Sequence, residues 1–247
     1  MHRKHLIGLA VVALAIGGVY ALLASRHTAP GDPLLWRVYE RAAQVQAYTQ
    51  DVRTEVRFPG QTLTIEGKYL VDRAAKRYAS VATTTLRSGK LPSRSFTLSN
   101  VSLGTLVYAR VDTRDGDLVS SFPRVGAWER FDARDIPERY AGIAIPGPIL
   151  DNLRILDDSG SFLVPVGAPV PEDGLMRYRF ELAPAHRGVT EGTLAVLLGR
   201  IATGTVSLWV TPEGEPRQLA FDGAGYRSTT TLSALDTPLT IEAPLVQ

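Results

Sequence analysis

From about residue 50 to the end of the chain, apolar side chains repeatedly occupy every second position. In VRTEVRF the residues Val52, Val56 and Phe58 alternate with charged ones, and after Pro59-Gly60 the segment TLTIEGKYLVD continues the same alternation. Side chains of a strand point alternately to opposite faces, so this period predicts half-buried strands, and the Pro-Gly step predicts a hairpin. The pattern restricts the chain to an antiparallel sheet with one apolar face.

The alternation returns in about ten or eleven segments, an ordinary to large number for one sheet, and ends with YRSTTTLSAL and LTIEA. Twist accumulates over so many strands, which predicts a strongly curled sheet. In GTVSLWVTPEGEPRQLAF, residues 204–221, Val206, Leu208 and Val210 would face the hollow of that sheet. Trp209 points the other way, where it either packs across strands or rests against a membrane interface or a partner.

Three segments have the three- and four-residue spacing of an amphipathic helix instead. The first begins at Asp32-Pro33, with an N-cap oxygen and a proline in the first turn, and runs through Ala47. The others are PGPILDNLRIL at 146–156 and TEGTLAVLLGRI at 190–201. Each carries an apolar stripe that has to be covered. We therefore predict an α+β fold, a half-barrel of about 10–11 strands whose concave face is lidded by about three helices.

An uncharged apolar run at 6–24, LIGLAVVALAIGGVYALLA, follows the basic residues His2 to His5. At about 1.5 Å per residue this run is long enough for a hydrocarbon core of roughly 30 Å. A cleavable signal peptide is the alternative, but a good small-x-small cleavage site is missing. We predict an uncleaved anchor over 1–25, a linker over 26–31 and one extracytoplasmic domain over 32–247. The localisation would be the cell membrane, single-pass, with a cytoplasmic N-terminus.

The composition excludes several function classes. The chain has 247 residues, of which 45% are hydrophobic, a formal net charge of +2 and no cysteine. Its arginines are scattered among acidic residues, so no nucleic-acid footprint is indicated. Without cysteine there is no disulfide, no thiolate metal site, no cysteine catalysis and no lipidated cysteine.

The sequence also offers little for catalysis or metal binding. His186 is the only histidine of the predicted domain and stands in a PAHRG loop. The acidic residues of DTRDGD, at 112–117, have the wrong spacing for a calcium loop and are typical of a hairpin turn, and Asp157-Asp158 is typical of a solvated turn. GxSxG, HExxH, P-loop and GxGxxG motifs are missing. We predict a protein that is not an enzyme and needs no metal or cofactor.

Two stretches resemble a known family. TLVYARVDTRDGDLVSSFPRVGAWERFDARDIPERY at 105–140 contains a strand, Gly126-x-Trp128, Asp132 and an Ile136-Pro137 step. Together with the hairpin at 204–221, it is similar to the LppX/LprG group of exported lipoproteins. That group belongs with the LolA- and RseB-like folds, in which a half-open barrel lidded by helices encloses an apolar cavity. The resemblance spans about residues 32–244 as a pattern of elements. Relatives of LppX and LprG are attached through a lipidated cysteine, which this chain lacks.

The resemblance implies binding of a lipid or acylated molecule between sheet and helices. Whether the hollow is empty or filled by its own side chains stays open at this stage. The candidate cavity-lining residues are Leu63, Ile65, Tyr69, Ile149, Leu153, Leu194, Leu197, Leu198 and Leu208.

Two functions follow from these observations. The first is a membrane-anchored extracytoplasmic binding protein that holds a lipid or acylated molecule for transport or transfer in the cell envelope, as a carrier of the lipoprotein type would. The alternative is an RseB-like sensor or assembly module, without enzymatic activity, that engages another envelope protein. A continuous apolar void favours the first, and a packed hollow favours the second.

Overall fold

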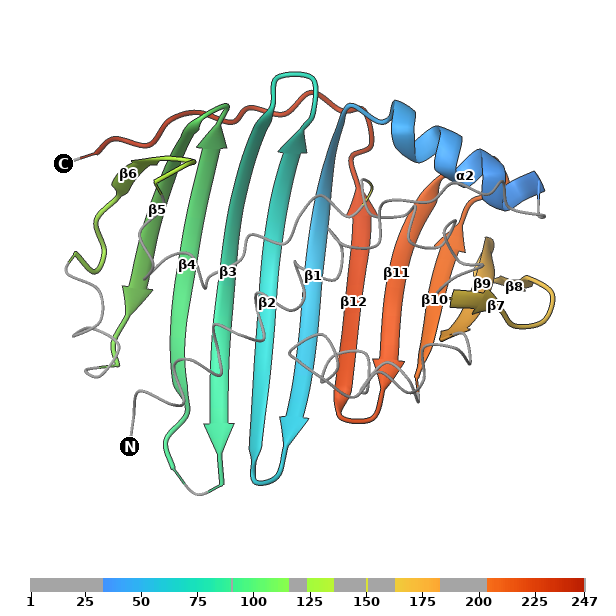
Figure 1. Cartoon of the computed structure of the whole chain (residues 1–247), viewed down its shortest axis with the longest axis horizontal. Coiled ribbons are helices and arrows are strands. Elements are labelled where there is room, and N and C mark those ends of the chain that lie inside the picture. Colours follow the sequence, from blue (N-terminus) through green and yellow to red (C-terminus); the bar gives the residue numbers. More distant parts are fainter. Residues whose placement is uncertain are drawn as a thin grey trace. The chain divides into compact units, whose positions relative to one another are not determined.

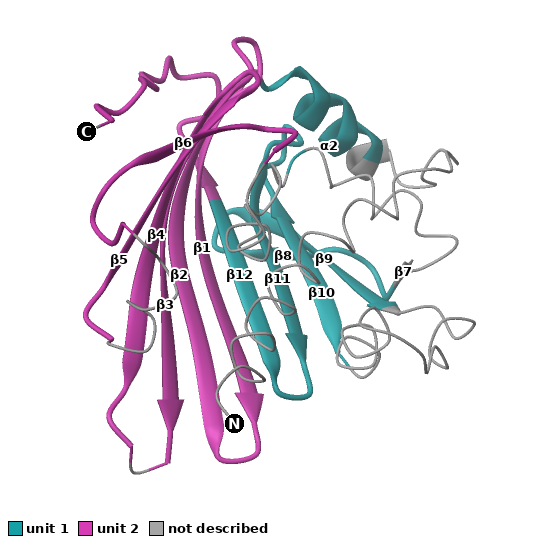
Figure 2. Cartoon of the chain, turned by 60° about the vertical axis from the view of Figure 1, so that its left-hand side comes forward, with its two compact units in different colours: residues 1–45, 142–231 teal, residues 46–141, 232–247 magenta. Residues whose placement is uncertain are grey.

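The computed structural model describes residues 33–89, 91–115, 124–135, 150, 163–182 and 204–246. These residues form one helix and twelve strands, and every strand pairing described between them is antiparallel. The chain divides into two compact units, which Figure 2 distinguishes by colour. Unit 1 comprises residues 1–45 and 142–231, and unit 2 comprises residues 46–141 and 232–247.

Unit 2 contains an open sheet in which each strand pairs with the next along the chain. The order is β6-β5-β4-β3-β2-β1, as Figure 1 shows. The strands are β1 (Ala47–Phe58), β2 (Gln61–Asp72), β3 (Arg77–Ser88), β4 (Arg94–Leu103), β5 (Leu106–Thr113) and β6 (Glu129–Asp132).

Short turns fix the register of this sheet. Gly60 and Gly104 have positive φ of 72° and 62° in the turns that join β1 to β2 and β4 to β5, a backbone conformation that glycine adopts without steric cost. From β1 to β5 the strands pair residue for residue without a register shift. The alternation predicted from the sequence therefore places every second residue of five strands on the same side.

Unit 1 contains the remaining strands and the helix. Its sheet has the order β12-β11-β10-β9-β7, and β8 pairs with β9. The strands are β7 (Leu163–Pro165), β8 (Val170–Glu172), β9 (Leu175–Leu182), β10 (Thr205–Val210), β11 (Pro216–Gly223) and β12 (Tyr226–Ser233). The hairpin expected at 204–221 is β10 and β11, with a register shift between Trp209 and Val210.

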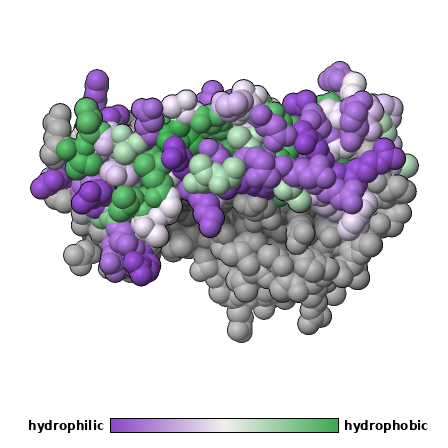
Figure 3. Space-filling view, turned by 90° about the horizontal axis from the view of Figure 1, so that it is seen from above, coloured by the Kyte–Doolittle hydropathy of each residue, from purple (hydrophilic) through white to green (hydrophobic). Residues whose placement is uncertain are grey.

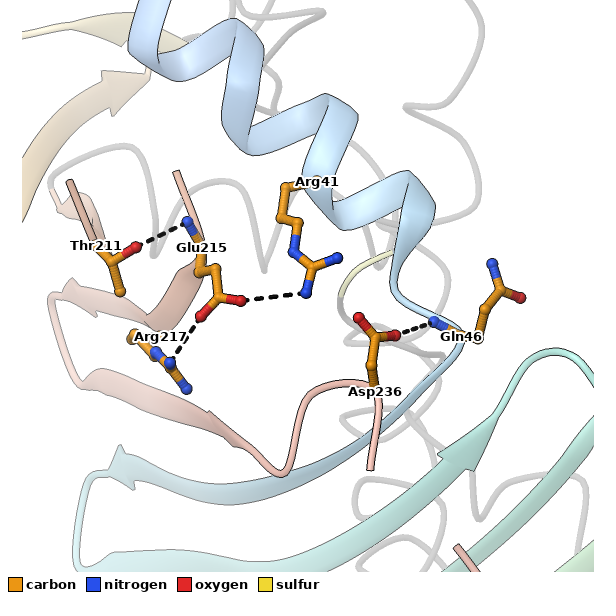
Figure 4. A network of polar contacts seen from close by, with 6 residues as sticks. All are labelled: Arg41, Gln46, Thr211, Glu215, Arg217 and Asp236. Carbon is orange, nitrogen blue, oxygen red and sulfur yellow. Dashed lines mark hydrogen bonds and ion pairs between the residues drawn. The ribbon is translucent and has the colours of Figure 1, made fainter. Parts of the chain in front are cut away.

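Helix α2 (Pro33–Gln44) confirms the amphipathic helix predicted after Asp32-Pro33, but it ends before the predicted Ala47, which is the first residue of β1. Its buried stripe consists of Val38, Tyr39 and Ala42, and Val45 is buried directly after the last turn. On the same helix, the Arg41 guanidinium donates to Glu215 at 3.2 Å, and Glu215 also accepts from Arg217 at 2.7 Å (Figure 4). The helix is therefore joined to the β10–β11 turn by an ion pair.

Gly214 makes that contact close. It has a positive φ of 93°, and a Cβ built on it would lie 3.1 Å from Cβ of Arg37. Figure 4 also shows a hydrogen bond between two segments of unit 2 that are far apart in the sequence. The backbone N–H of Gln46 donates to the carboxylate of Asp236 at 2.8 Å.

The predicted fold class is wrong. Instead of a strongly curled half-barrel lidded by about three helices, the described residues form open antiparallel sheets that neither close nor curl strongly, together with one short helix. Strand number alone does not bend a sheet. Strong curvature is made by bulges and glycine kinks, and β1 to β5 pair without any register shift. The helices predicted at 146–156 and 190–201 lie outside the described residues, apart from Leu150, which is helical and buried.

The last predicted strand is also corrected. LTIEA at 239–243 is not a strand. Ile241 is instead buried in an extended segment whose carbonyl accepts from the Arg77 guanidinium at 3.4 Å. An alternating pattern of only five residues therefore occurs here in a segment that does not pair with the sheet.

The predicted single-pass membrane localisation is corrected as well. Residues 6–24 lie outside the described part, and within that part no helix has the length and apolar character needed to cross a bilayer. The hydropathy of residues 6–24 indicates only that this segment would favour an apolar environment over water. It does not establish a membrane-spanning helix, on which the predicted localisation depended. The boundaries predicted for the linker and for a single domain over 32–247 stay predictions.

Candidate ligand-binding face

One side of the unit 2 sheet is buried, and we call it the inner face of unit 2. On β1 it carries the even-numbered residues, among them Tyr48, Gln50 and Val56, which are all buried. The odd-numbered side carries Arg53 and Arg57, which are exposed. On β2 the inner face carries the odd-numbered residues, because Val56 pairs with Leu63. The register has no shift between β2 and β3, so the inner face continues onto β3 in the same way.

A row of polar residues crosses the inner face. Gln50 pairs with Tyr69, Tyr69 with Ser80, and Ser80 with Asn100, on four successive strands. All four side chains are buried, with 2%, 3%, 6% and 7% exposure respectively. The row continues through buried Ala109 on β5 to Glu129 on β6. We call Gln50, Tyr69, Ser80 and Asn100 the polar row.

Apolar residues flank the polar row on both sides. Two residues nearer the start of β1 lies a row of mainly aromatic and aliphatic side chains: Tyr48, Val71, Tyr78, Ser102, Val107 and Phe131. Two residues in the other direction lies a row of small and aliphatic residues: Val52, Gly67, Ala82, Leu98 and Val111. The polar row is therefore a band between two mainly apolar rows, and beyond the small residues the next row again carries buried polar side chains, Thr54 and Thr84.

Tyr69 bends from the polar row towards the row of small residues. A Cβ built on Gly67 would lie 3.0 Å from Cε2 and from the hydroxyl oxygen of Tyr69, and 3.0 Å from Cβ of Ala82. The phenol therefore lies across the glycine, as aromatic residues do when they cover a glycine within a sheet. Burial raises the pKa of the Tyr69 phenol far above its usual range, so the group stays neutral and hydrogen-bonding at ordinary pH.

Unit 1 has a buried face of a different kind. Val206, Leu208 and Val210 are at most 1% exposed. Leu208 pairs with Tyr178 on one side and Leu219 on the other, and both are buried. We call this side the apolar face of unit 1.

Trp209, on the opposite side of β10, pairs with Arg177 of β9. The guanidinium lies 6.0 Å from the centroid of the indole and 2.8 Å from a carboxylate oxygen of Glu172. The sequence left open whether this tryptophan packs across strands or rests against a membrane or a partner. The contact with Arg177 favours packing across strands.

The predicted cavity-lining residues fall into three groups. Leu63, Ile65 and Tyr69 share the inner face of unit 2 on strand β2, and Leu208 lies on the apolar face of unit 1. The remaining residues lie outside the described part of the chain: Ile149, Leu153, Leu194, Leu197 and Leu198. Their assignment as ligand-lining residues stays a prediction.

The sequence reading missed Gln50, Ser80 and Asn100. Gln50 stands two residues before Val52, so the phase of β1 places it on the buried side. Ser80 and Asn100 join the same row only once the registers of three hairpins are known.

Figure 3 shows the described surface from above, with apolar and polar residues interspersed. The large exposed hydrophobic side chains of the described residues are Trp36, Val81, Leu91, Leu106, Val166, Val170, Leu245 and Val246. Leu245 and Val246 are neighbours in the segment after β12, and the others are spread over different parts of the chain. Exposed apolar residues of this kind are normal on a protein surface. The inner face of unit 2 is therefore the stronger candidate for a binding surface.

The described residues contain no group of three or more histidine, aspartate or glutamate side chains placed to hold a metal ion. In the DTRDGD stretch, Asp112 binds Arg110 at 2.8 Å, and Asp115 binds Arg94. These carboxylates are thus engaged by arginines. His186, Asp117 and Asp157-Asp158 lie outside the described residues. The exposed Asp132 has its pKa lowered, mainly by the side-chain hydrogen bond from Arg134.

Comparison with known proteins gives matches among solved structures only. No family model matches the chain, and no curated protein sequence matches it. LprF from Mycobacterium bovis is 15% identical with a TM-score of 0.48, covering 85% of this chain and 95% of that one. The lipoprotein LppX from Mycobacterium tuberculosis is 10% identical with a TM-score of 0.42, covering 86% and 100%.

LprF and LppX belong to the group that the sequence was found to resemble, so the predicted resemblance is confirmed. A β-barrel-like protein from Brucella abortus matches with 9% identity and a TM-score of 0.33, covering 76% of this chain and 97% of that one. None of these matches identifies a ligand for this chain.

Proposed function

We propose that this chain is a non-enzymatic binding protein that holds a lipid or acylated molecule against the inner face of unit 2, for transfer to a neighbouring molecule. The observation that carries the proposal is the composition of that face. Leu63, Val56 and Leu98 give it aliphatic side chains, whereas Gly67 and Ala82 at its centre leave little bulk of their own. A broad apolar surface with a few inward polar groups is the usual lining of a lipid site.

The energetics favour an acyl chain as the bound group. Each methylene removed from water is worth roughly 0.8 kcal/mol, so about ten of them supply on the order of 8 kcal/mol. That corresponds to about micromolar affinity before the cost of ordering the chain is subtracted. Among the described residues of this face the binding needs no metal and no catalytic side chain. The cavity-lining roles predicted for Ile149, Leu153, Leu194, Leu197 and Leu198 are part of the same proposal.

Lipid extraction and native mass spectrometry on the full chain, purified without detergent, test the proposal. We expect a co-purifying acylated molecule. Repeated recovery of a folded, empty protein that also fails to bind a fluorescent C16 fatty-acyl probe would contradict lipid binding. It would favour the alternative of a sensor or assembly module that engages another envelope protein.

A pair of variants on strand β3 locates the site. Ala82→Leu adds bulk on the inner face, whereas Ala79→Leu adds the same bulk two positions from Val81 on the outer face. We expect Ala82→Leu to weaken probe binding at least tenfold and Ala79→Leu to leave it within about twofold, because only the inner position takes volume from the acyl chain. Equal affinities in two folded variants would contradict this location.

A further inference from the structure

Two hairpin tips project from one end of the unit 2 sheet. They are the β1–β2 tip, residues 57–61, and the β3–β4 tip, residues 87–89 and 91–94, and both lie at the same end of the sheet in Figure 1. The last residue of β5, Thr113, pairs with Phe96, whereas β3 continues four residues beyond the partner of Phe96. At about 3.3 Å per residue the tips extend roughly 13 Å beyond the end of β5. We call these two segments the paired tips.

Backbone hydrogen bonds join the paired tips into one element. The N–H of Gly89 donates to the carbonyl of Gly60 at 3.1 Å, and the N–H of Leu91 donates to the carbonyl of Ser88 at 2.9 Å. Both glycines have positive φ, 72° at Gly60 and 50° at Gly89, which glycine adopts without steric cost. The two turns therefore hold each other in place at the projecting end of the sheet.

Apolar residues are exposed on the paired tips. Leu91 is 71% exposed, and the prolines of the two tips, Pro59 and Pro92, are exposed as well. A single exposed leucine is ordinary on a protein surface. Here the inner face also reaches the base of the β1–β2 tip with apolar side chains, Val56 on β1 and its partner Leu63 on β2. Apolar residues thus extend from the inner face to the projecting end of the sheet.

The charge on the paired tips is positive. The Arg57 guanidinium binds the carboxylate of Glu55 at 2.6 Å. Arg94 binds Asp115 through two guanidinium nitrogens. Arg87, exposed at the end of β3, has no carboxylate partner among the residues that the structure describes. Since arginine keeps its charge at every ordinary pH, the described part of this apolar end carries an uncompensated cation.

From these observations we propose that the paired tips dock on a membrane surface that carries anionic headgroups. Arg87, together with Arg114, which is exposed directly after β5, would contact headgroup phosphates. Leu91 would enter the boundary between headgroups and acyl chains, as the apolar residues of interfacial segments do. A purely acidic protein would be recognised by the arginines alone and would leave Leu91 in water, so the combination favours a lipid surface. Docking of this kind requires no acyl chain on the inner face.

A fluorophore at a single position tests the inference on the full chain, because the sequence has no cysteine of its own. Leu91→Cys, labelled with the environment-sensitive dye NBD, is titrated with vesicles of phosphatidylcholine and phosphatidylglycerol in a 3:1 ratio, and with phosphatidylcholine vesicles. We expect the emission to rise at least threefold and shift to the blue with the anionic vesicles only. Val81→Cys, on the outer face of β3 and 53% exposed, is the matched control and should not respond. An equal response at both positions, or none at Leu91, would overturn the proposal.

Charge variants of the labelled chain then test the role of the arginines. Arg87→Gln should weaken vesicle binding about fivefold, the effect of one arginine close to an anionic surface. Lys68→Gln, on the same outer face but about 20 Å along the strands from Arg87, is the control and should change the affinity less than about twofold. Equal losses in the two variants would contradict docking by the tips.

Two further outcomes separate this inference from its alternatives. A response of the Leu91 label to polyglutamate, with none to the anionic vesicles, would overturn lipid docking and assign the paired tips to an acidic protein partner. Failure of the acyl probe to bind would remove the proposed function, whereas a response of the Leu91 label in the same sample would still support docking.

Discussion

The two units bury polar side chains in different arrangements. In unit 1 the buried polar residues among the described strands, Ser228 and Thr230, lie along one strand, β12, while β9 and β10 present Phe180, Val206 and Leu208. In unit 2 the polar row runs across four strands, and further buried polar residues lie on several strands: Thr49, Thr54, Thr84 and Ser99. An arrangement along one strand leaves a continuous apolar core beside it. An arrangement across strands places hydrogen-bonding groups in the middle of the surface, which is where a ligand would contact them.

The largest expected difference between the units is in stability. Leu208→Ala on the apolar face of unit 1 removes a side chain that is 1% exposed, and we expect it to lower the free energy of unfolding by about 2–5 kcal/mol. Binding of the acyl probe by the folded protein should stay unchanged. Urea unfolding and probe titration on the same sample measure both quantities. Loss of probe affinity in folded Leu208→Ala would place the ligand on unit 1 instead.

The second difference concerns alkaline pH. Burial raises the pKa of Tyr226 in unit 1 from 10.0 to about 12, so between these values the unfolded chain has released a proton that the folded chain keeps. The associated stability is complete below pH 10 and is lost as the pH rises towards 12. A shift of this size corresponds to at most about 3 kcal/mol. Tyr226→Phe should flatten the fall in stability above pH 10, measured by urea unfolding at a series of pH values.

The same alkaline series sharpens the comparison through Tyr69 of unit 2, whose pKa is also raised by burial. Tyr69→Phe should flatten the curve as well, and the double variant should flatten it further. If neither phenylalanine variant changes the slope above pH 10, the phenols are not buried as described.

A third prediction tests the packing of Tyr69 on Gly67. Gly67→Ala should destabilise the fold by about 1–3 kcal/mol, because the new methyl group would lie 3.0 Å from the Tyr69 ring. In a Tyr69→Ala background the same change should destabilise less, since the contacts with the Tyr69 ring are removed and only the one with Cβ of Ala82, at 3.0 Å, remains. A double-mutant cycle by urea unfolding measures the coupling, and additive effects would contradict the contact.

The smallest expected effect is at the surface of unit 1. Arg177→Gln removes the guanidinium over Trp209 and its ion pair with Glu172. These partly exposed contacts are worth about 0.5–1 kcal/mol, so thermal unfolding should shift slightly and ligand binding not at all. A blue or red shift of the tryptophan emission should accompany the change, with Arg179→Gln on the same strand as control. A loss of several kcal/mol would show that Arg177 belongs to the core.

Much of this organisation follows from the alternation in the sequence. The phases of β1 and β2 placed Val56, Leu63 and Tyr69 on one buried side, and the spacing of Val38, Tyr39 and Ala42 predicted the stripe of α2. Both depend on local periods of two and 3.6 residues, which are properties of single segments.

The remaining features depend on pairing between segments. Strong curvature is made by bulges and glycine kinks, and strand number, on which the expected half-barrel was based, reveals neither. Ser80 and Asn100 became neighbours only through the hairpin registers of β2 to β4. Trp209 found its partner through β9, which is distant in sequence. A single sequence gives the face on which a residue lies but not the residue beside it.

Photolabelling tests the central claim most directly. A C16 acyl probe with a diazirine near its middle is bound to the full chain, irradiated, and the labelled residues are identified by tandem mass spectrometry. We predict labels on inner-face residues of β1 to β5, such as Leu63, Ala82 and Leu98, that disappear when an excess of the unlabelled C16 acyl chain is added. Labels confined to outer-face residues such as Val81, or to β9–β12 of unit 1, would contradict the account.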